Sequence, residues 1–355
     1  MPTSALPYQR AGAPVRLGLA LGYWGAAPPD DAEQLVAEAE RLGFDSIWTS
    51  EAYGSDALTP LAWLGRKTER VRLGTAVAQL HARTPAATAM AAATLDHLSG
   101  GRFILGLGVS GPQVVEGWHG RSFEAQLETT REYFAVIRQI LRREGPLQFS
   151  GTHFQLPRPG GRGKPLALTV HPLRADLPIW LAAQGPRNIA LAAEIADGWL
   201  AGFHAPRACR WQRDALVEGF ARRDARLDPS RFEVAASLLI AVDEDVDRAA
   251  DRFRALLALY IGGMGSGRHN FYFDLFCRMG FEEEATRVRE LFLGGQRQAA
   301  ERAVTRRLVE EVALVGPIEK LRDESERWRS SLPTLLLVSG PVEQLRAAAE
   351  LFGHG

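Results

Sequence analysis

Residues 70–112 constrain the fold more than any other segment, because they encode two strands joined by a helix. A β-favouring run at residues 71–77 precedes Thr84 and Pro85, where threonine suits a helix N-cap and proline suits the first helical position. The continuous apolar run at residues 103–107 is typical of a parallel strand that is buried on both faces. Parallel strands need such crossover helices, so this segment predicts an α/β fold.

The same alternation of strand and helix patterns continues along the whole chain. Runs of strand character occur at residues 15–22, 44–50, 71–77, 103–107, 179–183, 199–201, 232–242 and 335–338. Eight strand–helix units in 355 residues predict one (β/α)8 TIM barrel rather than a doubly wound sheet. Longer segments follow strands four and seven, and we expect these insertions to build a pocket over the barrel mouth.

The domain organisation that follows from this pattern is simple. Residues 15–355 form one barrel domain, and residues 1–14, which are non-periodic and contain proline, form a loose N-terminal arm. Residues 17–27 follow two arginines and imitate a signal peptide, but they fit a first core strand better. Within the insertion after strand four, residues 149–156 predict a hairpin, because a Ser-Gly turn lies between apolar ends.

Composition excludes several classes of partner. Lys and Arg number 42, as do Asp and Glu, so no net field favours nucleic acid or an anionic membrane surface. No apolar run is long enough to span a bilayer. Cys209 and Cys277 are far apart and lack CxxC spacing, so we expect neither a disulfide framework nor a cysteine-based zinc site. Two unpaired thiols are typical of a cytoplasmic protein.

Two glycine-containing turns are candidate anion sites, because each follows a strand end. Residues 106–111 read GLGVSG, which matches G-x-G-x-x-G, but a Rossmann fingerprint belongs in the first βαβ unit and this one follows strand four. Residues 182–188 run from a strand into Gly-Pro at a helix start. Backbone N–H groups in such turns can approach an anion closely, and Ser110 adds a hydroxyl. The alternative for each segment is an ordinary tight turn.

Other candidate residues are expected in loops at the barrel mouth. Glu51 ends strand two, a catalytic or ligand-binding position in a barrel, although a salt-bridged carboxylate is an equal alternative. His81 and His119 are candidate acid–base groups, and each could equally be a structural histidine. His171 and His269 fall in similar loops, and no histidine has metal-site spacing. Candidate aromatic walls for a flat ligand are Trp24, Tyr53 and Trp118.

Taken together, several segments resemble the bacterial luciferase-like monooxygenase superfamily. More narrowly, they are similar to its deazaflavin branch, the coenzyme F420-dependent oxidoreductases. The resemblance covers nearly the whole chain and implies that a flat deazaflavin ring stands in the barrel mouth, with FMN as the alternative cofactor. The segments that carry it are DSIWTSEAYG (45–54), RVRLGTAV (70–77), LDHLSGGRFILGLGVSGP (95–112), LPIWLAAQGP (177–186) and EIADGW (194–199).

The resemblance also implies roles for particular residues. Family members often have a non-proline cis peptide at the end of strand three, where it supports one face of the ring, and the matching position here is Ala76-Val77. Glu51 matches an acidic position beside the ring. The cofactor phosphate is implied to lie against the two glycine turns, formed by Gly108, Val109, Ser110 and Gly111 and by Ala183, Gln184, Gly185 and Pro186.

One departure from the family pattern affects the expected chemistry. Sugar-phosphate and alcohol dehydrogenases of this family have a histidine base directly after the acidic residue, whereas this chain has Ala52. An acid or base would then come from Glu51, His81 or His119, or none would be needed. We therefore expect hydride transfer between the deazaflavin and an organic substrate at a C=C, C=N or C–OH group.

Two alternatives of different classes stay open at this point. One is a monooxygenase that uses reduced FMN and O2, because the same fold serves both chemistries. The other is a non-catalytic deazaflavin- or flavin-binding protein, since the usual histidine is missing. The family resemblance further implies a homodimer, and it leaves the substrate unnamed.

Overall fold

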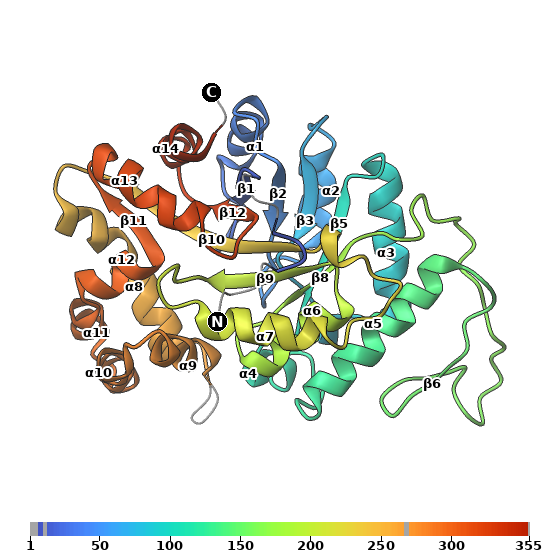
Figure 1. Cartoon of the computed structure of the whole chain (residues 1–355). Helices are drawn as coiled ribbons and strands as arrows, with labels where there is room; N and C mark the ends of the chain where they lie inside the picture. Colours follow the sequence, from blue (N-terminus) through green and yellow to red (C-terminus); the bar gives the residue numbers. More distant parts are fainter. Residues whose placement is uncertain (1–5, 10–12, 266–269, 354–355) are drawn as a thin grey trace.

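Eight parallel strands close into a barrel in the computed structural model, which describes residues 6–9, 13–265 and 270–353 (Figure 1). The last barrel strand pairs in parallel with the first, so the sheet has no free edge there. The predicted TIM barrel is confirmed. Its strands are β1 (Arg16–Ala20), β2 (Ser46–Thr49), β3 (Arg72–Thr75), β5 (Phe103–Gly108), β8 (Ile179–Ala182), β9 (Gly198–Phe203), β10 (Glu233–Val242) and β12 (Leu335–Val338).

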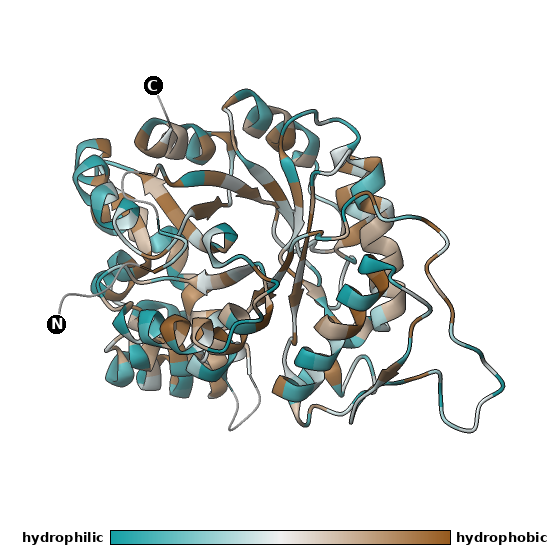
Figure 2. Cartoon of the chain, turned by 45° about the vertical axis from the view of Figure 1, so that its right-hand side comes forward, coloured by the Kyte–Doolittle hydropathy of each residue, from teal (hydrophilic) through white to brown (hydrophobic). Residues whose placement is uncertain are grey.

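Helices surround the barrel and cover its outer face. Thr84 caps α3 by accepting a hydrogen bond from the Ala87 N–H at 3.2 Å, with Pro85 in the first turn, as the sequence predicted. Hydrophobic residues concentrate in the strands, and the outer turns of the helices carry hydrophilic ones (Figure 2). The covering helices are α1 (Ala32–Arg41), α2 (Leu58–Gly65), α3 (Pro85–Leu98), α5 (Gln126–Arg142), α6 (Pro186–Ile195), α7 (Arg210–Phe220), α13 (Ile318–Arg329) and α14 (Val342–Phe352).

Two tryptophans fill the inside of the barrel. Trp48 and Trp180 are fully buried, and their ring centroids lie 5.1 Å apart. A Cβ at Gly74 would lie 2.3 Å from the Trp48 ring, and one at Gly198 would lie 2.5 Å from the Trp180 ring. These glycines are therefore required for the indoles to fit, because interiors have no spare volume for even one more carbon.

A network of four charged residues closes the N-terminal end of the barrel. Arg72 contacts Asp45 at 2.6 Å and Glu233 at 2.8 Å, and Arg16 pairs with the same two carboxylates. Although burial opposes its charge, Glu233 and Asp45 hold the pKa of Arg72 above its ordinary value. The charges come from β1, β3, β10 and the residue before β2, so the network ties these elements together below the tryptophans.

The fourth-strand insertion contains α4 (Pro112–Val115), α5 and the predicted hairpin, which is confirmed as β6 (Phe149–Ser150) paired with β7 (Gln155–Leu156). Arg174, near its end, forms an ion pair with the fully buried Asp96 of α3, which fixes the long loop to the barrel. This insertion extends furthest from the barrel (Figure 1).

The seventh-strand insertion builds a second hydrophobic core beside the barrel. It also contains a strand that the sequence did not predict, β11 (Ala313–Gly316), which pairs with the C-terminal residues of β10. One further short strand, β4 (Ala78–Gln79), follows β3 and pairs with β5. The helices of the insertion are α8 (Val246–Gly263), α9 (Phe271–Arg278), α10 (Glu282–Leu293), α11 (Arg297–Ala303) and α12 (Arg306–Val312).

Part of the segment expected to be a loose N-terminal arm packs against the barrel. Leu6 and Tyr8 are buried, and the Tyr8 hydroxyl donates a hydrogen bond to the Leu332 carbonyl at 3.2 Å. The Tyr8 ring also lies 5.6 Å from that of Phe232. Residues 1–5 and 10–12 of the same segment lie outside the described part of the chain. Among the described residues, no helix combines the length and the apolar character that crossing a bilayer requires.

Candidate functional site

A cavity of about 350 Å³ opens at the C-terminal ends of the barrel strands. Its walls come from the segments that follow β1, β2, β3, β5 and β8, and from the seventh-strand insertion. This is the face on which TIM-barrel enzymes place their active sites, because the loops that follow the strands converge there. Both insertions that we expected over the mouth contribute, and the Phe123 ring from one lies 6.4 Å from the Phe271 ring of the other.

The end of β3 forms one wall of this cavity. The Ala76-Val77 peptide is cis, as the family resemblance implied, and Val77 lines the cavity. The Ser50 hydroxyl donates to the Ala76 carbonyl at 3.0 Å, which holds the bulge against the end of β2. A Cβ at Gly108 would lie only 2.7 Å from Cγ2 of Val77, so β5 can approach this wall only because it has glycine there.

The two glycine turns meet in the same cavity. Gly108, Val109, Ser110 and Gly111 all line it, and Ser110 adopts a left-handed backbone conformation with φ of 61°. Ala183, Gln184 and Gly185 line it from the other side, while Pro186 begins α6. The first N–H groups of α6 have no partner within the helix and are therefore free to bind an anion.

The side chain of Gln184 provides this wall with a hydrogen-bond acceptor that has no partner. Its Oε1 is buried and has no hydrogen-bond partner. Buried amide oxygens are almost always paired, so an unpaired one in a cavity wall indicates a missing donor. A Cβ at Gly202 would lie 2.6 Å from the Gln184 amide nitrogen, so the glycine leaves the space that this side chain occupies.

Glu51 lines the cavity and is salt-bridged, as one of the two alternatives held, while its catalytic or ligand-binding role stays a prediction. Its Oε2 accepts from Nη1 of Arg83 and from the Gln79 N–H, each at 2.8 Å, and the residue is 8% exposed. The hydrogen bond from Arg83 to Glu51 raises the pKa of the guanidinium.

Gln79 connects this carboxylate to one of the predicted histidines, and we did not single it out from the sequence. Its amide nitrogen donates to the carbonyls of Glu51 and Ala52, each at 3.1 Å. Its Oε1 therefore accepts, and the Nε2 of His119 at 2.8 Å must carry the proton that it donates. The only sequence signal for Gln79 is its position two residues after the cis bulge.

Of the predicted histidines that the structure describes, His81, His119 and His171 do not line the cavity. His119 lies behind Gln79, and the Nε2 of His81 lies 2.8 Å from the Gln126 Oε1. His171 lies in the insertion after strand four, and its carbonyl contacts the His97 ring near the end of α3. His269 lies outside the described residues. Any acid–base role of His81 or His119 stays a prediction, and it would act through a neighbouring group.

The three aromatic residues that were predicted to form walls of the site do not all line this cavity. Tyr53 lines the cavity, whereas Trp24 lines a neighbouring one of about 560 Å³ beside α1 and α2, and Trp118 is 67% exposed. Three other aromatic residues of the mouth, Tyr23, Phe271 and Tyr272, were not singled out from the sequence. They come from a loop after β1 and from α9, and no local pattern links these segments.

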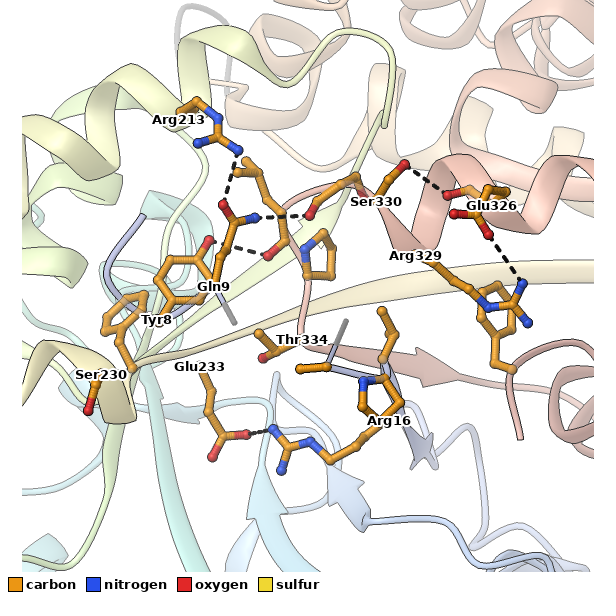
Figure 3. Close-up of a pocket in the computed structure, with 18 of the residues that line it drawn as sticks. Tyr8, Gln9, Arg16, Arg213, Ser230, Glu233, Glu326, Arg329, Ser330 and Thr334 are labelled. Atoms are coloured by element: carbon orange, nitrogen blue, oxygen red, sulfur yellow. Dashed lines mark hydrogen bonds and ion pairs between the residues drawn. The ribbon is translucent and has the colours of Figure 1, made fainter. Parts of the chain in front are cut away.

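A larger cavity of about 930 Å³ lies at the opposite, N-terminal end of the barrel (Figure 3). Its polar side chains largely partner one another: Arg213 donates to Gln9, Gln9 donates to the Ser331 carbonyl, and Arg16 pairs with Glu233. Such satisfied groups leave little unmet capacity for a ligand. Within the described residues no three metal-binding side chains come together. The mouth is therefore the candidate active site.

Comparison with known proteins identifies the family of the chain. Residues 8–335 match the family model described as luciferase-like monooxygenase. The chain belongs to this family. A relative from Mycobacterium tuberculosis, named "putative coenzyme F420-dependent oxidoreductase", is 49% identical over 342 residues, which is 95% of this chain and 99% of the relative.

Solved structures share the fold of this luciferase-like chain. The coenzyme F420-dependent tetrahydromethanopterin reductase of Methanopyrus kandleri superposes with a TM-score of 0.78 at 24% identity, over 95% of this chain and 98% of that one. An F420-dependent secondary alcohol dehydrogenase, solved with an F420-acetone adduct, superposes with a TM-score of 0.76 at 19% identity, over 96% and 100% of the two chains. At these identities the likeness concerns the barrel and not the substrate.

Proposed function

We propose that this luciferase-like protein is a coenzyme F420-dependent oxidoreductase that transfers hydride between the deazaflavin and an organic substrate. The observation that carries the proposal is the meeting of the cis Ala76-Val77 bulge and both glycine turns in one cavity. The 49% identity to a relative named for coenzyme F420 supports the choice of cofactor. Relatives in this family named as oxidoreductases support the reaction class.

The residues of the mouth fit such a cofactor. Val77 offers an apolar face for a flat ring, and the turns at 108–111 and 183–186 offer backbone N–H groups for a phosphate. The unpaired Oε1 of Gln184 would accept a hydrogen bond from a polar N–H or O–H of the ligand. Each of these groups belongs to a different strand end, so one ligand would contact all of them only if it spanned the mouth.

The chain's own residues would bind and orient the reactants. A bound deazaflavin supplies two-electron hydride chemistry. Glu51, held by Arg83 and the Gln79 N–H, would fix the loop after β2 in the wall of the mouth. Gln79 holds that loop by its carbonyls at residues 51 and 52, so it would keep the wall of the site in place when a substrate enters.

A cofactor titration tests the proposal. Purified protein is titrated separately with coenzyme F420 and with FMN, and binding is followed by visible absorbance and fluorescence. We expect saturable binding of coenzyme F420 and weaker binding of FMN. Tight FMN binding without F420 binding would favour the monooxygenase alternative. Binding of F420 without oxidation of its reduced form by any substrate of a broad panel would favour the non-catalytic alternative.

A matched pair of variants shows whether binding occurs in the mouth. Gln184→Leu removes the unpaired acceptor from the cavity wall and is expected to weaken F420 binding about tenfold, as loss of a buried hydrogen bond does. Gln155→Leu changes an exposed residue of β7 and serves as the control. Equal affinity in both variants would mean that the cofactor does not contact Gln184.

A further inference from the structure

A second cavity, of about 560 Å³, lies beside the mouth, and the proposed function does not use it. It is formed by the loops that follow β1 and β2 and by the helices α1 and α2. We call it the α1–α2 cavity, because its lining residues fall within 21–33 and 49–64. Small-molecule pockets are concave, largely apolar and about 300–1,000 Å³ in volume, so this cavity has the size of a ligand site.

The two loops that build this cavity also build the mouth, from their other side. In the loop after β1, Tyr23 lines the mouth and Trp24 lines the α1–α2 cavity. In the loop after β2, Glu51 lines the mouth, whereas Ser50 and Asp56 line the α1–α2 cavity. The two cavities therefore share a wall, and a ligand in one would contact the loops that shape the other.

The walls of the α1–α2 cavity contain two indoles, those of Trp24 and Trp63. Trp63 is 60% exposed, yet its Nε1 donates a hydrogen bond to Oε1 of Glu33 at 3.2 Å. Glu33 is ion-paired with Lys67, so this hydrogen bond and the ion pair hold the indole of α2 against α1. The guanidinium carbon of Arg66 lies over the ring, 5.7 Å from its centroid. An exposed ring that is held in place in a cavity wall is suited to stacking on a flat ligand.

The carboxylate of Asp30 gives this cavity a charge without a partner. Asp30 is exposed and forms no hydrogen bond or ion pair with any other described residue. Asp56 adds a second carboxylate, whose Oδ1 accepts from the N–H groups of Leu58 and Thr59, each at 2.8 Å. Although burial opposes its charge, these hydrogen bonds hold the pKa of Asp56 below its ordinary value. Arg83 lies 3.9 Å from Asp56 and offsets part of its charge, so Asp30 is the carboxylate left for a cation.

We propose that the α1–α2 cavity is a binding site for a flat aromatic molecule that carries a protonated amine. The aromatic body stacks on Trp63 and contacts Trp24, and the ammonium group lies against Asp30. Indole faces attract cations as well as flat rings, so both parts of such a ligand suit these walls. None of the residues that line this cavity lines the mouth, so the site does not depend on the proposed function.

Three dansyl compounds test the site by fluorescence, because the dansyl group is a flat naphthalene whose emission rises in apolar surroundings. Dansylcadaverine carries a cationic amine, dansylamide is uncharged, and dansylglycine carries a carboxylate. We expect saturable binding with affinity falling in that order, and about a two- to fivefold difference between the cationic and the uncharged compound, as an exposed ion pair contributes. Asp30→Asn should remove this difference and leave the affinity for dansylamide unchanged.

Variants of the indoles locate the probe. Trp63→Ala is expected to weaken the binding of dansylcadaverine about tenfold, and Trp24→Ala should weaken it as well. Trp118→Ala is the matched control, because Trp118 is 67% exposed and lines neither cavity. Trp63 is exposed too, so its loss should change the midpoint of urea unfolding little, which separates a lost contact from a lost fold.

Each outcome decides the inference. It is overturned if dansylcadaverine does not bind saturably, or if the Trp63→Ala and Trp118→Ala variants bind it equally well. An unchanged preference for the cationic compound in Asp30→Asn overturns the assigned partner of the amine. Competitive displacement of the probe by coenzyme F420 would place it in the mouth and would also overturn the inference.

A second copy of the chain is the competing occupant of this cavity. If Trp63→Ala converts a dimer into a monomer in analytical ultracentrifugation, and the probe binds only the monomer, the cavity is an interface between copies and the inference is wrong. Failure of coenzyme F420 to bind bears on the proposed function alone, since the dansyl titrations need no cofactor.

Discussion

The contact between Gly108 and Val77 allows a sharp test of how the mouth is built. In Gly108→Ala the new Cβ would lie 2.7 Å from Cγ2 of Val77, whereas ordinary contacts of this kind begin at 3.4 Å. Val77 is β-branched, so its side chain has few alternative rotamers with which to make room. The overlap must then be relieved by a shift of the wall that we assign to the ring.

The magnitude follows from the size of this overlap. Overpacking by one methyl group in a well-packed site costs about 1–3 kcal/mol, which corresponds to roughly a 5- to 150-fold change in an equilibrium constant. We expect this cost to be shared between weaker F420 binding and lower stability. The assay is an F420 titration together with urea unfolding, with Gly145→Ala as the control, because no atom lies within 4 Å of a Cβ at that position.

A double variant identifies the contact responsible. Val77→Ala removes the methyl groups that the new Cβ at position 108 would meet, so Gly108→Ala should cost much less in the Val77→Ala background than in the wild type. If Gly108→Ala binds F420 with unchanged affinity and unfolds at the same urea concentration, Val77 does not form a rigid wall of the cofactor site. Additive effects in the double variant would contradict the assigned contact.

Further predictions concern the barrel and its association. Arg72→Met removes one of the two guanidinium groups that pair with Asp45 and Glu233, and it should lower the free energy of unfolding by about 1–3 kcal/mol. Lys67→Met breaks an exposed pair and should cost below about 1 kcal/mol, so equal losses in urea unfolding would contradict the role of the N-terminal network. Gly74→Ala places a carbon 2.3 Å from the Trp48 ring and should lower the thermal midpoint by several degrees; an unchanged midpoint would mean that the barrel interior has spare room. Burial lowers the pKa of His204 to about 4, so on acidification the unfolded state binds a proton at a higher pH than the folded state does. The free energy of unfolding should therefore fall by up to about 3 kcal/mol as the pH drops from 6.5 to 4. This dependence on pH should weaken in His204→Gln, and an identical pH profile of urea unfolding in the variant would rule out His204 as its source. The homodimer implied by the family stays a prediction, and a monomer in analytical ultracentrifugation would contradict it.

The sequence predicted those features that depend on local patterns. The cap at Thr84, the buried run of β5 and the overall alternation need only neighbouring residues to be recognised, and all agree with the structure. The cis peptide at Ala76-Val77 came from the family resemblance, and no periodicity signals it. The strand β11 was missed because its four residues lie among helices and are stabilised by pairing with β10, far away in the sequence.

The site was only partly predictable for the same reason. The glycine turns can be recognised by composition. The hydrogen bonds of Gln79, in contrast, join it to residues that lie 27 to 40 positions away in the sequence. Trp24 follows Tyr23 directly, yet it lines a different cavity, because neighbouring residues of a loop can face opposite sides.

The adjacent, tilted indoles of Trp48 and Trp180 give the molecule an optical reporter of its own interior. Their ring centroids lie 5.1 Å apart, close enough for the electronic transitions of the two rings to couple. The near-ultraviolet circular dichroism of the protein should therefore contain a signal from the centre of the barrel. Trp63 and Trp118 are 60% and 67% exposed and would respond to solvent quenchers instead. Loosening of the barrel could thus be distinguished from movement at its surface in the unlabelled protein.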